Sequence, residues 1–183
     1  MRGKILAVID MQNDFVTGSL GTKEAQKIIP AAVRRILECR DNGYYVYATQ
    51  DTHTGDYLST PEGKKLPVIH CVEHTKGWAL QEDVDRAIMA GPHTTVNKNT
   101  FGSLRMAQDI LDRCRDYDLS QEDMEIELIG LCTDICVISN ALLLKAYLPC
   151  AAIRVNSACC AGVTPELHQK ALDVMRSCQI EVI

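Results

Sequence analysis

The chain has 183 residues, a length that suits one domain with a substantial core. Hydrophobic residues make up 46% of it and charged residues 23%, as in ordinary globular proteins, and the net charge of −5 argues against binding to nucleic acid or to anionic membranes. The nine cysteines, together with the lack of a signal-like or bilayer-length apolar run, indicate a reduced cytoplasmic protein rather than a disulfide framework or a membrane protein.

Apolar runs and helical periodicities alternate along the chain. Residues 4–10 predict a buried strand that ends in an acid, and residues 24–40 have helical spacing, although Pro30 suggests that this helix begins only near Ile29. Residues 50–78 have no clear period, and loops of this length in compact domains are usually functional or disordered. The remaining strands are expected at 44–49, 94–96, 125–131, 151–155 and 179–183, and the remaining helices at 81–90, 103–114, 134–147 and 165–178.

This order of elements predicts a three-layer α/β/α fold of the Rossmann-like kind. Its central sheet would have six mainly parallel strands, with helices on both faces. In such folds ligands bind beyond the carboxyl ends of the strands. Asp10, Asp51, Lys98 and Cys136 each follow a separate predicted strand, so they are expected at one edge of the sheet.

Cys136 is the candidate nucleophile, with Asp10 and Lys98 as its helpers. It is expected at a strand-to-helix junction, where free backbone N–H groups and the helix dipole favour a thiolate. The alternative for any single cysteine is a buried apolar role, and most of the other cysteines fit it. A redox or metal role for Cys132 and Cys136 is disfavoured, because a spacing of three intervening residues is not a usual signature of either.

Asp51 and His53 follow a predicted strand and are two residues apart, so on extended backbone their side chains face the same way. A carboxylate and an imidazole on one side can share a divalent ion, and His70 lies later in the same irregular loop. Loop hydrogen bonding by these residues is an equally good reading of the sequence alone.

Three stretches resemble the isochorismatase-like cysteine hydrolases, and nicotinamidases in particular. They are Asp10-Met11-Gln12-Asn13-Asp14-Phe15, then Lys98, then the segment from Gly130 to Val137. The resemblance covers nearly the whole chain and implies a single hydrolase domain over residues 1–183, with a metal-binding or lid loop at about 50–78. It also implies a homo-oligomer.

The resemblance implies a role for each site residue. Cys136 would attack an amide carbonyl, Asp10 would carry the proton to the leaving ammonia, and Lys98 would support the ionised groups. The backbone N–H groups of Cys132 and Cys136 would form the oxyanion hole. A cis peptide is expected at Leu131–Cys132, and Leu131 and Phe15 would contact the substrate.

The same resemblance implies one divalent metal ion, zinc first, with iron or manganese as alternatives. Asp51, His53 and His70 match three of its ligands, and Glu62 is the best candidate for the fourth. The tryptophan that flanks the substrate ring in several nicotinamidases is replaced around Leu66 or Pro67, so the chemistry is better supported than the substrate.

The leading hypothesis is an amidase that converts a small carboxamide, nicotinamide above all, into carboxylate and ammonia through a cysteine thioester. A metal-free carbamoyl or ureido amidase with the same triad is the second hypothesis. A thiol or binding protein without turnover is the third. Isochorismatase activity is disfavoured, because vinyl-ether hydrolysis would leave Cys136 without a role.

Overall fold

A six-stranded sheet forms the centre of the molecule in the computed structural model, which describes residues 3–183. The strand order is β3-β2-β1-β4-β5-β6, and every neighbouring pair is parallel, which confirms the predicted α/β fold. The strands are β1 (Lys4–Ile9), β2 (Tyr45–Asp51), β3 (His93–Lys98), β4 (Glu125–Leu131), β5 (Ala152–Ala161) and β6 (Glu181–Val182).

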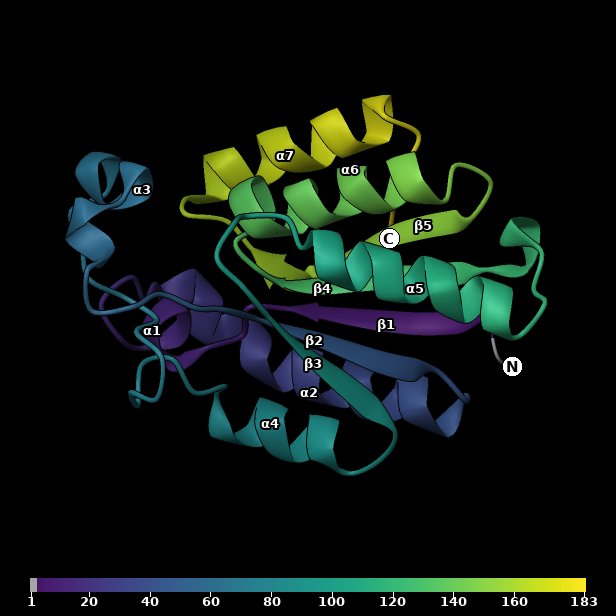
Figure 1. Ribbon diagram of the computed structural model, residues 1–183, viewed down its shortest axis with the longest axis horizontal. Coiled ribbons are helices and arrows are strands. Elements are labelled where there is room, and N and C mark those ends of the chain that lie inside the picture. The colour runs from purple at the N-terminus through teal and green to yellow at the C-terminus, as the bar shows by residue number, and fades with distance from the viewer. Residues whose placement is uncertain (1–2) are drawn as a thin grey trace.

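Helices cover both faces of this sheet (Figure 1). One face packs against α5 (Leu104–Asp116), α6 (Ile138–Tyr147) and α7 (Pro165–Ser177), and the other against α2 (Lys23–Asp41) and α4 (Glu82–Met89). Two short helices, α1 (Asn13–Val16) and α3 (Pro61–Lys65), lie in the connections that follow β1 and β2. Within residues 3–183, no helix combines the length and the apolar character that crossing a bilayer would require.

The β1 side chains explain why the central strands appear in the sequence as apolar runs. Ile5, Leu6, Val8 and Ile9 are all fully buried, because a central strand of a parallel sheet has helices on both sides. Burying each such side chain contributes about 1.5–3 kcal/mol to folding. The strand therefore holds a rigid position at the middle of the sheet, and Asp10 follows it directly.

Helix α2 runs through Pro30, so the expectation that it begins only near Ile29 is wrong. Thr22 caps its N-terminus by accepting a hydrogen bond from the Ala25 N–H at 3.0 Å. Pro30 leaves the carbonyl of Gln26 without a helical partner, but both residues are exposed, so water can satisfy that carbonyl. Pro30 is not one of the buried residues of the helix, so the buried face continues past it from Ile29 to Ala32.

The connection from β4 to α6 also differs from the sequence prediction. The sequence predicts a regular helix from residue 134, but Thr133–Val137 forms a π-helical turn and α6 begins only at Ile138. Such turns are rare and are often found at functional sites. Strand β5 is longer than expected, because a register shift opposite Leu128 and Gly130 allows pairing to continue to Ala161.

The strand order reverses between β1 and β4. Connections from these two strands leave the sheet in opposite directions, which opens a crevice at their carboxyl ends. Asp10 follows β1, and Cys136 lies in the turn after β4. The fold therefore places the proposed base and nucleophile on either side of this crevice.

Candidate active site

Asp10 turns the chain out of the sheet. Its φ of +47° is uncommon for a residue other than glycine, although aspartate tolerates this region better than most. The side chain is fully buried, and its Oδ1 accepts a hydrogen bond from the Thr49 hydroxyl at 2.6 Å. Its Oδ2 forms an ion pair with an ammonium group at 2.6 Å and has no neutral hydrogen-bond donor among the described residues 3–183. One carboxylate oxygen is thus held by a hydroxyl and the other by a charge.

Lys98 links three buried groups. It is the last residue of β3, and its long side chain crosses the end of β2 to bring Nζ within 2.6 Å of Asp10 Oδ2. The same Nζ lies 3.6 Å from Cys136 Sγ and 3.7 Å from Asp51 Oδ1. Burial lowers the pKa of Lys98, but the charges of Asp10 and Asp51 raise it, so the net pKa is raised and the side chain remains an ammonium.

Cys136 lies in the π-helical turn with only 5% of its surface exposed. The peptide bond Leu131–Cys132, just before this turn, is cis, as expected. The Cys132 carbonyl accepts hydrogen bonds from the N–H groups of Ile135 and Val137, both at 3.1 Å. These bonds close the turn and fix the direction of the Cys136 side chain.

The resting state of the Cys136 sulfur differs from the sequence expectation. Burial raises its pKa well above the usual thiol value, and the nearby charge of Asp10 raises it further, whereas Lys98 lowers it by less. The sulfur therefore rests as a thiol and not as a thiolate. Burial also raises the pKa of Asp10, which suits that carboxylate to accept the thiol proton.

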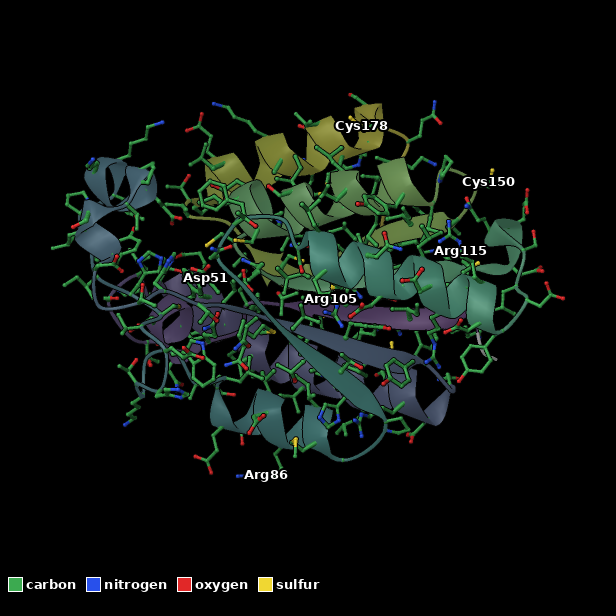
Figure 2. The ribbon with its side chains drawn as sticks, in the orientation of Figure 1. Asp51, Arg86, Arg105, Arg115, Cys150 and Cys178 are labelled. Atoms are coloured by element: carbon green, nitrogen blue, oxygen red, sulfur yellow. The ribbon has the colours of Figure 1, made fainter. Side chains whose placement is uncertain are left out.

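Asp51, His53 and His70 form a second cluster beside Lys98. Asp51 ends β2, and His53 is held by hydrogen bonds from its N–H to the Cys71 carbonyl and from the Glu73 N–H to its own carbonyl, both at 2.9 Å. His53 Nε2 lies 3.0 Å from Asp51 Oδ2, and His70 Nε2 lies 3.4 Å from the same oxygen. Asp51 lies at the end of the molecule near α3, away from Cys150 (Figure 2).

These distances fit a divalent metal ion. Two ligand atoms that each lie about 2.1 Å from an ion are about 3.0 Å apart at right angles and about 3.4 Å apart at the tetrahedral angle. The donor atoms of Asp51, His53 and His70 all lie within 4.8 Å of one another. His70 Nδ1 lies 2.8 Å from the Val68 carbonyl, an acceptor that leaves Nε2 free to bind an ion.

Glu62 lies slightly farther from the centre of this cluster. It is in the first turn of α3, which is capped by the Thr60 hydroxyl, and its Oε1 lies 4.0 Å from His53 Nε2 and 3.9 Å from His70 Nε2. Burial raises the pKa of Asp51, but hydrogen bonds with the two histidines and the Lys98 charge lower it more, so the net pKa is below the usual range. Asp51 is therefore ionised, as metal binding requires.

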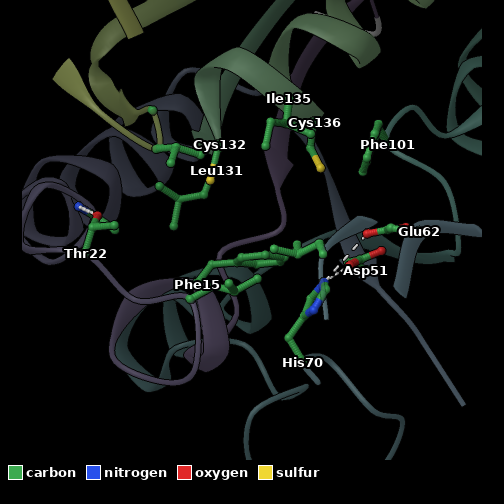
Figure 3. A pocket seen from close by; sticks show the side chains of 15 residues that line it. Phe15, Thr22, Asp51, Glu62, His70, Phe101, Leu131, Cys132, Ile135 and Cys136 are labelled. Carbon is green, nitrogen blue, oxygen red and sulfur yellow. Dashed lines mark hydrogen bonds and ion pairs between the residues drawn. The ribbon is translucent and has the colours of Figure 1, made fainter. Parts of the chain in front are cut away.

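A cavity of about 190 Å³ connects the two clusters. Figure 3 shows Phe15 beneath it, Cys136 and Leu131 on one side, and Asp51, Glu62 and His70 on the other. Phe15 and Leu131, which are expected from the sequence to contact the substrate, both line this cavity. Leu66 lines the cavity, whereas Trp78 does not line it and donates from its indole N–H to the Thr52 hydroxyl at 2.9 Å.

Sequence reasoning missed five apolar wall residues, which are Leu20, Ala25, Phe101, Ile135 and Val163. Phe101 follows β3 by three residues and remains 48% exposed, so an aromatic residue shortly after a strand end was the available signal. Ile135 and Val163 lie after β4 and β5, at the same edge of the sheet.

Comparisons with known proteins agree with this geometry. The isochorismatase domain matches residues 4–183. A nicotinamidase/pyrazinamidase of Mycobacterium tuberculosis is 28% identical over 189 residues, and the alignment covers 98% of each chain. The crystal structure of a pyrazinamidase/nicotinamidase from Streptococcus mutans has a TM-score of 0.83 at 26% identity, covering 98% of this chain and 99% of that one. A pyrazinamidase of Pyrococcus horikoshii, solved in complex with zinc, has a TM-score of 0.77 at 24% identity, covering 99% and 98%. The chain therefore belongs to the isochorismatase domain family, and it is a hydrolase that acts on amide C–N bonds.

Proposed function

We propose that this enzyme hydrolyses a small aromatic carboxamide, nicotinamide first, to the carboxylate and ammonia through a thioester on Cys136. One observation carries the proposal: a single ammonium, Lys98 Nζ, lies within 3.7 Å of the candidate nucleophile, the candidate base and a candidate metal ligand. Residues 50–78 would form the metal-binding lid of one hydrolase domain.

Proton transfer within the triad would begin the reaction. The Cys136 thiol gives its proton to Asp10 as the sulfur attacks the carbonyl carbon. Asp10 then gives the proton to the amide nitrogen, the C–N bond breaks, and ammonia leaves. Water attacks the thioester with Asp10 again as base, which releases the carboxylate and restores the thiol. Lys98 remains charged throughout and offsets the negative charge that passes between oxygen and sulfur.

The apolar walls and the metal cluster would orient the substrate. Phe15 and Leu131 line the cavity, where they would contact the faces of a flat ring and exclude water from the thioester. Asp51, His53 and His70 would hold a divalent ion, with Glu62 as a further ligand, and a bound ion supplies a Lewis acid that can accept a ring nitrogen. The backbone N–H groups of Cys132 and Cys136 would donate hydrogen bonds to the developing oxyanion.

A panel of amides with ammonia detection tests the proposal. Nicotinamide and pyrazinamide are expected to react, and benzamide, which has the same shape without a ring nitrogen, is expected to react at least tenfold more slowly. Cys136→Ala should abolish all turnover, whereas Cys160→Ala, which removes a buried thiol from β5, should retain it. Turnover by Cys136→Ala would refute the thioester route. A preference for carbamoyl or ureido compounds, in protein that binds no metal, would favour the metal-free alternative.

A further inference from the structure

The edge of β2 that faces β1 loses its strand partner before β2 ends. The β1–β2 register stops at Ile9↔Thr49, and the next bond runs from the Asp10 N–H to the Thr49 carbonyl at 3.2 Å. Asp10 then leaves the sheet. Asp51, two residues beyond Thr49, therefore has no main-chain partner on this edge among residues 3–183, although only 6% of its surface is exposed. Unpaired backbone groups at such a buried position would be costly.

The side chain of Gln12 takes the place of the missing strand. Its Oε1 accepts from the Asp51 N–H at 2.7 Å, and its Nε2 donates to the Asp51 carbonyl at 2.8 Å. Nε2 also donates to the Trp78 carbonyl at 2.8 Å. Gln12 itself is fully buried, and although it stands at the N-cap of α1, its side chain makes no cap bond there. One amide thus satisfies both backbone groups of Asp51.

The position of Asp51 matters to both clusters of the site. Its Oδ2 lies 3.0 Å from His53 Nε2 and 3.4 Å from His70 Nε2, while its Oδ1 lies 3.7 Å from Lys98 Nζ. A shift of the Asp51 backbone would therefore change the donor distances at the metal cluster and the contact with the triad together.

We propose that Gln12 is a positioning residue that fixes Asp51, so that one side-chain amide sets the geometry of the metal cluster relative to the Asp10 base. The inference rests on the proposed metal-containing function. Asp14, in the same segment, adds to it: its Oδ2 accepts from the Cys71 N–H at 2.8 Å, next to His70. The segment after Asp10 therefore holds the backbone of one candidate metal ligand, Asp51, and the residue next to another, His70.

Zinc affinity, measured by competition with a chromophoric chelator, tests this role. Gln12→Met keeps the length of the side chain and removes its hydrogen bonds. Gln50→Met is the matched control, because Gln50 is also buried and donates to the same Trp78 carbonyl at 3.0 Å but has no side-chain bond to Asp51. Loss of an outer-shell partner typically weakens metal binding 10–100-fold. We expect at least a tenfold loss in Gln12→Met and less than a twofold change in Gln50→Met.

The visible spectrum of the Co²⁺-loaded protein should also change in Gln12→Met and not in Gln50→Met, because it reports ligand geometry. Equal zinc affinities in the two variants would overturn the inference while leaving the proposed function intact. Should Gln12→Met fail to fold, Gln12→Glu puts a carboxylate oxygen in place of the donor to the Asp51 carbonyl, and wild-type zinc affinity in that variant would overturn the inference equally. Absence of zinc and Co²⁺ binding by the wild type would overturn the metal centre and this inference together.

Discussion

Replacing Lys98 with methionine should destabilise the fold, because it leaves two buried carboxylates without their ammonium. Nζ lies 2.6 Å from Asp10 Oδ2, and at an effective dielectric constant of about 20 this contact is worth about 6 kcal/mol before desolvation is counted. Removing one partner of a buried ion pair costs about 3–5 kcal/mol. We therefore expect Lys98→Met to lower the free energy of unfolding by about 3–5 kcal/mol at pH 8.

The loss should shrink as the pH falls. Burial already raises the pKa of Asp10, and Lys98 is the strongest influence that lowers it, so removing Lys98 raises this pKa further. A carboxyl group whose folded pKa exceeds its unfolded value favours the folded state below the unfolded pKa, and that contribution is lost as the pH rises through the folded pKa. Lys98→Met should therefore be closer to the wild type at about pH 5 than at about pH 8.

Urea unfolding of chelator-treated protein measures both effects. The series compares the wild type, Lys98→Met, Asp10→Asn and the double variant, with Lys145→Met as the control for loss of a surface lysine. The double variant should recover at least about 2 kcal/mol relative to the sum of the single variants, since no charge is left unpaired between these two positions. Strict additivity, or a loss that grows on acidification, would refute the reasoning.

Three further predictions follow from the same geometry. Alkylation of Cys136 by iodoacetamide, followed by mass spectrometry, should accelerate with pH to beyond about pH 9, because burial raises the thiol pKa; a plateau near neutral pH would contradict this. Arg35→Met should lower the free energy of unfolding by about 3–5 kcal/mol, because it removes the guanidinium that bonds the fully buried Glu127 at 2.7 and 2.5 Å; an unchanged urea midpoint would count against it. In equilibrium dialysis, His70→Ala should lose zinc binding, whereas Glu62→Gln should weaken it about tenfold; equal losses would mean that Glu62 is as tight a ligand as the histidine.

The strand ends were predictable because local patterns encode them. An apolar run stops where the chain leaves a buried sheet, so the sequence alone assigns Asp10, Asp51 and Lys98 to one edge of the sheet. The course of α2 through Pro30 was not predictable in the same way. It depends on whether the Gln26 carbonyl, which Pro30 leaves without a helical hydrogen bond, faces water. That exposure is a property of the folded molecule and not of the local sequence.

The protonation of the Cys136 sulfur also could not be predicted from the sequence. Its position after a strand predicted a thiolate, because helix termini stabilise anions. The structure buries Cys136 and places a carboxylate beside it, and these two effects act in the opposite direction. Gln12 belonged to a recognisable motif, but its bonds to Asp51 arise from the divergence of β1 and β2, which local periodicity does not report.

The parallel pairing of β1 with β4 ties activation of the sulfur to the completion of folding. Residues 4–9 must meet residues 125–130 before Asp10 and Cys136 face one another, and contacts between segments so distant in sequence form slowly. Until that pairing forms, Asp10 does not face the Cys136 thiol and cannot take its proton. Assembly of the sheet is therefore the step that gives this cysteine its proposed acid–base partner.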